Sequence, residues 1–453
     1  MKKIAVIGAG ISGLTLAYRL RQLGAAVHVY EAADRCGGVI VTENLNGSLV
    51  EWGPNLLLTR SRTVIDFLND LGLSAQAYVA NPCAKQRYIY KEGQLIPVPL
   101  SLLEFVRSPL LSSRAKFRLL KEPFIGKGFG DESLADFVRR RLGSEFLANI
   151  ANPFVAGVYA GKPELLSTLH AFPKLWQLEQ DHGSLAKGAL FRSRQAKKKL
   201  LESPLAGKMV SFSAGLNTLV SALTENLRGR ITLNKPIEGL WHDATAGQYQ
   251  LIFSGQRLSE GYHQVALTTP ASESARILGT FTRQDLAPLK NLPYAPLAVV
   301  SSVYQRRHIA HPLDGYGVLV PEQEQQQVLG ILFRSSLFPG QARPGHAVLS
   351  TFLGGARQPE LLQRENGELI YMAQQAADRW LGTSDKPKYC GIKRWPQAIP
   401  QYSPNHGLVL ALIQSIEAKN PGLVFSGNYR SGISVPDCID YNLRLAQTLM
   451  LSD

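Results

Sequence analysis

Residues 4–38 read IAVIGAGISGLTLAYRLRQLGAAVHVYEAADRCGG. The apolar run Ile4–Ile7 predicts a short buried strand, and Val27–Tyr30 predicts a second one. Between them, Leu14–Leu23 carries apolar residues at helical spacing, and Gly24 is typical of a helix end. The stretch therefore predicts a strand, a turn, a helix and a second strand, which is the unit of an α/β fold.

The turn in this unit has the spacing G-x-G-x-x-G, formed by Gly8, Gly10 and Gly13. The first glycine permits a tight turn, the second lets the backbone approach a pyrophosphate, and the third lets the helix pack closely on the strand. Glu31 ends the second strand, where a carboxylate binds a ribose 2′-hydroxyl and repels a 2′-phosphate. The pattern predicts dinucleotide binding and disfavours NADP. The alternative is a glycine-rich turn in an ordinary α/β unit.

Length and composition set wider limits. The chain has 453 residues, enough for two or three lobes, and a formal net charge of +14. Its four cysteines are far apart, so we expect neither a disulfide framework nor a metal site. The glycines near the N-terminus argue against a signal peptide, and no apolar run approaches the ~20 residues of a membrane span. No nucleic-acid motif occurs, so the positive charge favours an anionic membrane surface or an anionic small substrate.

The next segments predict short strands and one helix. Asn46-Gly47 is a hairpin turn signal, and Gly53-Pro54 has little side chain that would keep a ring away from its backbone. We expect a helix over residues 62–80 and two strands in 84–99 around the turn Glu92-Gly93. Arg87 lies in the first of these strands beside aromatic residues, where a solvated arginine is the ordinary interpretation.

Residues 100–205 are expected to be mostly helical. Leu102–Val106 and Ala115–Leu120 are amphipathic, with basic residues between their apolar positions. A second basic cluster follows, formed by Arg192, Arg194, Lys197, Lys198 and Lys199. Apolar faces beside clustered basic residues favour contact with a membrane surface, and a solvated helix face is the alternative.

The remaining chain predicts a sheet-based lobe and a return to the first lobe. We expect strands at 297–303, 317–320, 328–333 and 347–352, and then a helix at 368–381. Near the C-terminus, an apolar strand leads into Gly427-Asn428, then Gly432–Val435, and then a helix to Met450. A helix that begins after glycines again presents free N–H groups to a cofactor.

Several of these segments resemble the flavin amine oxidase superfamily. The first is E-A-A-D-R-C-G-G, where Arg35 and Gly37-Gly38 suit a second approach to the pyrophosphate. Two further strings, F-V-A-G-V-Y-A-G at residues 154–161 and G-N-Y-R-S-G-I-S-V-P-D-C at residues 427–438, are similar to the protoporphyrinogen oxidase branch of that superfamily. The resemblance extends over nearly the whole chain.

What the resemblance implies is an FAD enzyme that oxidises protoporphyrinogen IX to protoporphyrin IX in haem synthesis. Six electrons leave in three flavin cycles, and with O2 as the acceptor each cycle yields hydrogen peroxide. Oxidation of coproporphyrinogen III to coproporphyrin III is the first alternative. An amine oxidase or a carotenoid desaturase is the second, and a flavin-free binding protein of the same fold is the third.

The resemblance also implies site residues. No catalytic side chain is certain. The substrate residues are a propionate-binding arginine, a glycine that faces the ring, two aliphatic residues around one pyrrole and a stacking aromatic: Arg87, Gly157, Leu319, Leu332 and Phe352. Without the resemblance, Leu319, Leu332 and Phe352 would be interpreted as residues of the hydrophobic core. The residues implied for FAD are Gly8, Ala9, Gly10, Ile11, Ser12, Gly13, Glu31, Ala32, Arg35, Gly37, Gly38, Val39, Gly53, Pro54, Asn55, Leu56, Ile237, Trp395, Gly427, Asn428, Ile433, Ser434 and Val435.

The expected architecture is α/β, with a Rossmann-like FAD domain, a sheet-based substrate domain and an inserted helical domain. The FAD domain is discontinuous (1–80, 206–290 and 391–453), the substrate domain covers 81–99 and 291–390, and the helical, membrane-associating domain covers 100–205. The expected partners are the porphyrinogen, O2 and a membrane surface, and the assignment admits a homodimer. The expected location is cytoplasmic, peripheral on the inner face of the cell membrane.

Overall fold

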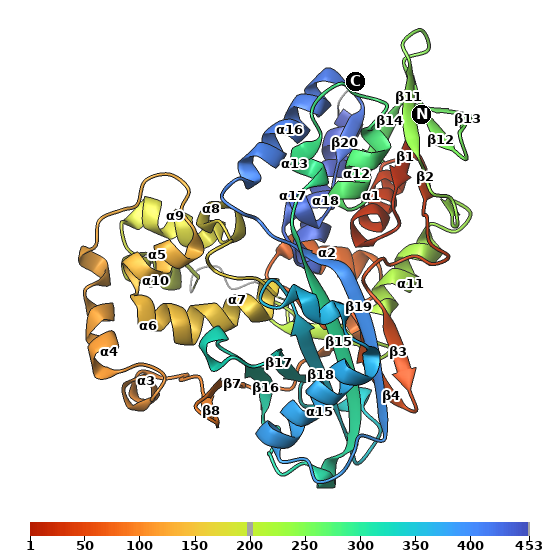
Figure 1. Ribbon diagram of the computed structural model, residues 1–453. Coiled ribbons are helices and arrows are strands. Elements are labelled where there is room, and N and C mark those ends of the chain that lie inside the picture. The colour runs from red at the N-terminus through yellow and green to blue at the C-terminus, as the bar shows by residue number, and fades with distance from the viewer. Residues whose placement is uncertain (197–202, 452–453) are drawn as a thin grey trace.

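The computed structural model describes residues 1–196 and 203–451 (Figure 1). Lys197, Lys198 and Lys199 of the second basic cluster lie outside the described residues, and the side chains of Arg192 and Arg194 are not described either. A parallel sheet with its helices lies at the upper right of Figure 1, a long mixed sheet lies below it, and a group of helices lies to the left.

The parallel sheet contains the first strand–helix–strand unit. Its order is β10-β2-β1-β14-β20, and every neighbouring pair is parallel. The strands are β1 Lys3–Ile7, β2 Ala26–Tyr30, β10 Ile231–Thr232, β14 Gln264–Leu267 and β20 Leu423–Phe425. The predicted Rossmann-like sheet is therefore confirmed, and its outer strands come from segments more than 200 residues after the first unit.

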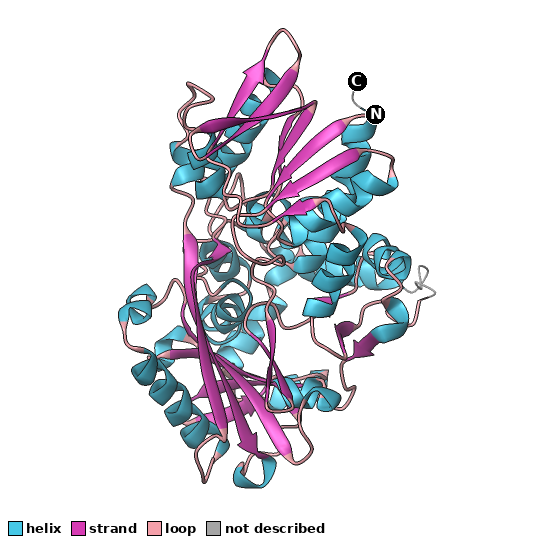
Figure 2. Cartoon of the chain, turned by 90° about the vertical axis from the view of Figure 1, so that its right-hand side faces the viewer, coloured by secondary structure: helices cyan, strands magenta, loops and turns pink. Residues whose placement is uncertain are grey.

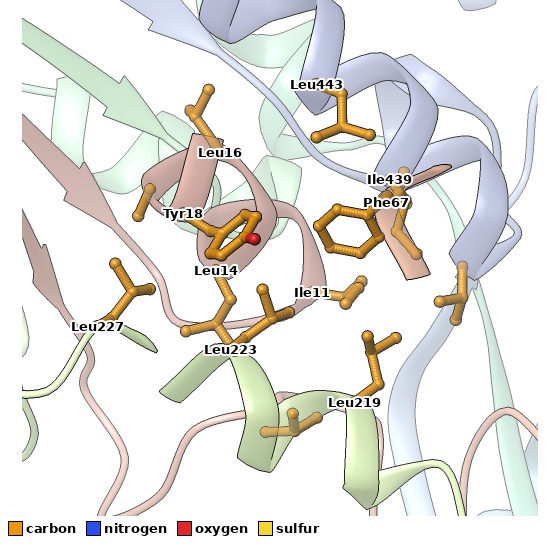
Figure 3. Close-up of a cluster of buried hydrophobic side chains, with 14 of the residues drawn as sticks. Ile11, Leu14, Leu16, Tyr18, Phe67, Leu219, Leu223, Leu227, Ile439 and Leu443 are labelled. Carbon is orange, nitrogen blue, oxygen red and sulfur yellow. The ribbon is translucent and has the colours of Figure 1, made fainter. Parts of the chain in front are cut away.

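Alternate residues of β1 pack into two different hydrophobic clusters, one on each face of the parallel sheet. Helices cover one face, and helices together with a small second sheet cover the other. Ile4 and Val6 join a cluster built with α1 Ile11–Gln22, α2 Arg62–Asp70, α11 Asn217–Asn226 and α18 Val435–Leu451. Figure 3 shows its centre, where Tyr18 of α1 and Phe67 of α2 meet edge to face with ring centroids 5.8 Å apart. Ala5 and Ile7 join the opposite cluster, which includes α12 Ala271–Leu278, α13 Ala287–Lys290, α16 His406–Lys419 and the sheet of β11 Gly239–Asp243, β12 Gln248–Phe253 and β13 Gln256–Tyr262.

The second main sheet is mixed and has the order β19-β15-β18-β17-β16-β7-β8, in which β7 and β16 are parallel and the other pairs antiparallel (Figure 2, lower half). Its strands are β7 Gln86–Lys91, β8 Gln94–Pro97, β15 Tyr294–Gln305, β16 Gly315–Leu319, β17 Val328–Phe333, β18 His346–Gly354 and β19 Tyr389–Pro400. The helix α15 Asn366–Leu381 packs on one face. The domain boundary expected after residue 390 falls inside β19, which pairs with β15 on both sides of it.

The region expected to be mostly helical is so in its described residues, 100–196 and 203–205. Its helices are α3 Leu102–Arg107, α4 Ser113–Leu120, α5 Leu134–Arg141, α6 Ser144–Phe146, α7 Asn152–Tyr159, α8 Thr168–Ala171, α9 Pro173–His182 and α10 Leu185–Ala196. In residues 1–196 and 203–451, none of the helices has the length and apolarity needed to cross a bilayer.

One expected element is shorter than predicted, and one turn is confirmed. The helix expected over 62–80 ends at Asp70, because the chain reverses at Gly72 with φ +70°. It then forms β6 Ala77–Val79, which joins β9 Met209–Phe212 and β5 Leu57–Leu58 in a small sheet. The Asn46-Gly47 turn does connect a hairpin, between β3 Thr42–Leu45 and β4 Ser48–Glu51.

Candidate functional site

The first glycine-rich turn lies between β1 and α1. A Cβ atom at Gly13 would overlap the carbonyl oxygen of Gly8, so this glycine allows the helix to close on the strand. Thr268, just after β14, donates its hydroxyl to the carbonyl oxygens of Ile7 (2.8 Å) and Gly8 (2.9 Å). A Cβ atom at Gly10, in contrast, would meet no protein atom within 4 Å. The side of the turn at Gly10 therefore has room for a ligand.

The N-terminus of α1 faces this room with unpaired backbone donors. Within the described residues, the N–H groups of Ile11, Ser12 and Gly13 have no protein acceptor. Such N–H groups and the positive end of the helix dipole bind phosphate. The open space and the free donors together fit a pyrophosphate.

Glu31 lies at the carboxyl end of β2, as predicted. Its carboxylate accepts hydrogen bonds from the N–H groups of Ala9 (2.6 Å) and Ala33 (2.9 Å), which fix its direction. Its backbone carbonyl accepts from the N–H of Lys235 (2.8 Å), so the segment carrying Ile237 runs beside it. The N–H of Ile237 has no acceptor within residues 1–196 and 203–451. Both positions fit the ribose and adenine end of a dinucleotide.

The second glycine pair packs directly on the first turn. Gly37 donates its N–H to the carbonyl of Ala9 (2.8 Å), and a Cβ atom at Gly38 would lie 3.4 Å from the Cα of Gly10. Arg35 is exposed and donates to the carbonyl of Gly38 (2.6 Å), so in this structure it closes its own turn. Neighbouring Ala32 and Val39 are also exposed beside this turn.

The segment Gly53-Pro54-Asn55-Leu56 connects β4 of the hairpin to β5 of the small sheet. A Cβ atom at Gly53 would overlap the carbonyl oxygen of Val39, so the glycine is required by the chain itself and not only by a ligand. Leu56 packs against the cluster that includes Leu332 of the mixed sheet. The segment therefore lies where the two lobes meet.

Trp395 enters the same junction from β19. Its indole N–H donates to the carbonyl of Trp52 (2.6 Å), the residue before Gly53. The ammonium of Lys393 lies 5.3 Å from the centre of the Trp395 ring. Trp395 thus lies beside the Gly53 segment, although the two are far apart in the sequence.

A buried ion pair in the junction was not predicted. Glu51 and Arg334 are 0% and 1% exposed, and the two charges are 3.3 Å apart. Burial raises the pKa of Glu51 and lowers the pKa of Arg334, while the attraction between them opposes both shifts. Arg334 also donates to the backbone carbonyl of Asn55 (3.0 Å) and to the side chain of Gln341. Arg334 belongs to α14 Arg334–Leu337, directly after β17, and no local signal pairs it with Glu51.

The C-terminal glycine segment connects β20 to α18 through the short helix α17 Asn428–Ser431. Tyr402 holds it: the phenol hydroxyl donates to the carbonyl of Asn428 and accepts from the N–H of Gly432 (3.1 Å). Cys438, near the start of α18, packs in the same buried cluster as Ile11 of α1, so the N-termini of these two helices lie close together. The predicted cofactor residues in this connection are Gly427, Asn428, Ile433, Ser434 and Val435.

The predicted substrate residues of the mixed sheet share one face. The register pairs Arg87 with Gly317, and Gly317 with Leu332. It also pairs Leu319 with Gly330, and Gly330 with Phe352. Paired residues point to the same side of a sheet, and residues two apart on a strand share a face. Arg87, Leu319, Leu332 and Phe352 therefore lie on one face, opposite to α15.

The fifth predicted substrate residue covers this face from outside. Gly157 lies on α7, and a Cβ atom added to it would be 2.6 Å from Cδ2 of Leu319. Asn152, at the start of α7, accepts from Arg357 (2.6 Å) and from the N–H of Glu322 (2.9 Å), which fixes the helix to the mixed sheet. The structure thus brings the five residues together. It also adds Tyr316, which lies over Arg87 and which sequence reasoning missed.

Comparisons with known proteins identify the family of this chain. The model of the family "Flavin containing amine oxidoreductase" matches residues 11–450. Mitochondrial protoporphyrinogen oxidase of Nicotiana tabacum is 32% identical over 96% of this chain and 92% of its own length. Coproporphyrinogen III oxidase of Bacillus subtilis is 25% identical over 97% and 96%. A crystal structure from Exiguobacterium sp. 255-15 matches the fold with a TM-score of 0.84 at 24% identity, over 100% of this chain and 99% of that one. The matched family binds FAD, which confirms the predicted cofactor.

Proposed function

Because this chain belongs to the flavin-containing amine oxidoreductase family, we propose that it uses its FAD to oxidise a porphyrinogen, with protoporphyrinogen IX as the preferred substrate. The product is protoporphyrin IX. The macrocycle loses six hydrogen atoms in three cycles, and in each cycle one O2 takes two of them and becomes hydrogen peroxide. The observation that carries the proposal is the single face formed by Arg87, Leu319, Leu332 and Phe352 beneath Gly157.

The chemistry of a porphyrinogen suits this face. The substrate is a large apolar ring with propionate carboxylates, so it needs apolar walls and a cation. Leu319 and Phe352 supply partly exposed apolar surface, and Leu332 extends it inward. Arg87 is exposed at the edge of the same face. A hydrogen bond between its guanidinium and a carboxylate contributes about 1.5–3 kcal/mol.

In this mechanism the protein side chains position the substrate and exclude water, and the redox chemistry belongs to the flavin. Bound FAD would supply a two-electron acceptor for one meso-carbon hydride in each of the three cycles. Three protons leave with the three hydrides, two from pyrrole N–H groups and one from the fourth meso carbon. The apolar walls hold the meso carbon in place and keep water from the reacting carbon. No side chain is assigned as the base in this mechanism.

Coproporphyrinogen III is the second candidate substrate. It undergoes the same chemistry but carries four propionates. The coproporphyrinogen III oxidase of Bacillus subtilis aligns with 97% of this chain. The apolar trio Leu319, Leu332 and Phe352 favours the less charged protoporphyrinogen.

The helical region supports a second part of the proposal, a peripheral contact with a membrane. Its first helices and the loop after them expose large apolar side chains: Leu100, Leu102, Leu103, Val106, Phe117, Leu120, Phe124 and Phe129. The basic residues Arg107, Arg114 and Lys121 are exposed among them. Exposed apolar side chains interspersed with basic ones match an interface with anionic lipid. The proposed location is the cytoplasmic face of the cell membrane, and the homodimer stays a prediction.

A fluorescence assay tests the substrate. Purified holoprotein is given protoporphyrinogen IX or coproporphyrinogen III in air, and the growth of porphyrin fluorescence is followed against a heat-denatured control. We expect faster growth with protoporphyrinogen IX and release of three hydrogen peroxide per porphyrin. Faster growth with coproporphyrinogen III would select the second candidate, and growth with neither would overturn the proposal.

A further inference from the structure

The strand β16 contains an irregularity that changes the direction of one side chain. Its register with β7 pairs Gly315 with Gln86 and Gly317 with Arg87, so Tyr316 is an extra residue between two consecutive partners. An extra residue of this kind is a β-bulge, and bulges redirect side chains beside functional sites. The sequence G-Y-G at 315–317 therefore forms a β-bulge within this strand.

Both glycines of the bulge are required by their neighbours. A Cβ atom at Gly315 would overlap the carbonyl oxygen of Gln86, and one at Gly317 would overlap the carbonyl oxygen of Ile331. Gly317 also has φ +152°, a conformation that other residues rarely adopt. The bulge is thus fixed by packing on both neighbouring strands.

The bulge moves Tyr316 to the proposed substrate face. Strict alternation would place it with Val318, which packs in the core beneath α15. Instead Tyr316 packs against the cluster of Leu332, to which Phe352 and Leu56 also contribute. The guanidinium carbon of Arg87 lies 5.2 Å from the centre of the Tyr316 ring, a cation–π distance.

The hydroxyl of Tyr316 is available to a ligand. It has no hydrogen-bond partner in residues 1–196 and 203–451, and it is not among the sealed polar atoms of those residues. Burial of the ring raises the pKa of Tyr316, and the charge of Arg87 opposes this rise. The phenol is therefore neutral near pH 7 and can donate a hydrogen bond.

We propose that Tyr316 is a second carboxylate-binding residue, whose hydroxyl donates a hydrogen bond to the same propionate that Arg87 neutralises. The inference rests on the proposed function, because it takes a porphyrin-type carboxylate as the ligand. The bulge and the cation–π contact hold the two donors side by side, so one carboxylate can accept from both. An apolar wall alone would position the ring, whereas this pair fixes which edge of the ring faces Arg87.

Binding of two probes to Tyr316→Phe tests the proposal. The probes are protoporphyrin IX and its dimethyl ester, and the dissociation constant is measured with the holoprotein by fluorescence. Phenylalanine keeps the ring, the packing and the contact with Arg87, and it removes only the hydroxyl. Because a hydrogen bond to a charged group is lost, Kd for the free acid should rise by about tenfold or more, and Kd for the ester should not change.

Two further variants serve as controls. Arg87→Ala should weaken binding of the free acid more than that of the ester. Tyr90→Phe removes a hydroxyl from the opposite face of the mixed sheet, where Tyr90 packs beside Trp380, and should change neither Kd.

The outcomes separate this inference from the proposed function. An unchanged Kd of Tyr316→Phe for the free acid, or an equal loss for acid and ester, would overturn the role of Tyr316. A wild-type protein that binds the porphyrin but does not oxidise the porphyrinogen would overturn the function and leave the binding comparison valid. A wild-type protein that binds neither probe would overturn both.

Discussion

Gly157 of α7 lies directly against the side chain of Leu319 on β16: a Cβ atom at position 157 would come within 2.6 Å of Leu319 Cδ2. Gly157→Ala should therefore displace the end of this leucine, which forms one wall of the proposed substrate face. A flexible side-chain end can move, so we expect a destabilisation of about 1 kcal/mol, at the low end for overpacking. The expected result is a KM for the porphyrinogen that is raised several-fold, with unchanged flavin content.

A matched glycine controls for this change. A Cβ atom at Gly126, also in the helical region, would meet nothing within 4 Å, so Gly126→Ala should leave KM as in the wild type. An equal effect of the two substitutions would show that Gly157 does not act through Leu319.

Alanine substitutions at Gly10 and Gly13 should have different effects, one on FAD binding and the other on stability. At Gly13 the new methyl group overlaps the carbonyl of Gly8, so Gly13→Ala should lower the melting temperature of the flavin-free protein. At Gly10 the methyl group meets no protein atom, so Gly10→Ala should leave that temperature unchanged but weaken FAD binding. Thermal melts with and without added FAD separate the two effects, and normal FAD affinity of Gly10→Ala would contradict the proposed pyrophosphate position.

The buried pair of Glu51 and Arg334 predicts a large asymmetry between single and double variants. Glu51→Gln leaves the Arg334 charge buried without its partner, which costs about 3–5 kcal/mol of unfolding free energy. The double variant Glu51→Gln/Arg334→Met should recover part of that loss, since no charge remains buried. Denaturant titration measures both.

An exposed ion pair supplies the control for this comparison. Arg364 and Glu368 are 3.6 Å apart and about half exposed, so Glu368→Gln should change the unfolding free energy by less than about 1 kcal/mol. A double variant of the buried pair that is no more stable than Glu51→Gln would show that the charges do not depend on each other.

His406 predicts a loss of stability in acid. It stacks on Tyr402 with ring centroids 4.2 Å apart, and burial lowers its pKa to about 4, with the nearby His170 acting in the same direction. Because the unfolded chain then binds more protons between pH 6.5 and about 4, stability falls as the pH drops through this window.

The variant His406→Phe isolates this contribution because phenylalanine keeps a ring but does not titrate. Between pH 7 and pH 5, the wild type should lose about 2 kcal/mol more unfolding free energy than His406→Phe does. His242 is exposed, so His242→Phe should lose as much unfolding free energy between pH 7 and pH 5 as the wild type does. Identical pH dependence in His406→Phe and the wild type would rule out this role.

Vesicle binding tests the membrane contact. The wild type should sediment with anionic vesicles more than with neutral ones. Phe117→Ser and Leu120→Ser on α4 should each weaken this binding by about tenfold, because a fully buried Phe or Leu contributes about 1.5–3 kcal/mol. Leu408→Ser on α16 changes a leucine of similar exposure far from this surface and should have no effect. Equal losses in all three variants would contradict a specific contact.

Local sequence determined the elements whose reasons lie within a few residues. The turn of Gly8 and Gly13, the strand that ends at Glu31 and the Asn46-Gly47 hairpin were predicted at their positions, because turn geometry and apolar spacing act over one or two elements. The helix expected over 62–80 was too long, because the reversal at Gly72 and the pairing of β6 with β9 end it early. The resemblance to the flavin amine oxidase superfamily then predicted FAD as the cofactor.

Only the tertiary structure decided which distant residues meet. Glu51 and Arg334 are 283 residues apart in the chain, and no local pattern pairs two charges across that distance. Tyr316 changes face because its neighbouring strands force a bulge, which strand alternation alone cannot predict. The contact of Gly157 with Leu319 likewise exists only because α7 packs on the mixed sheet. Local propensities set the helices and strands of this protein, whereas burial and pairing between lobes set its site.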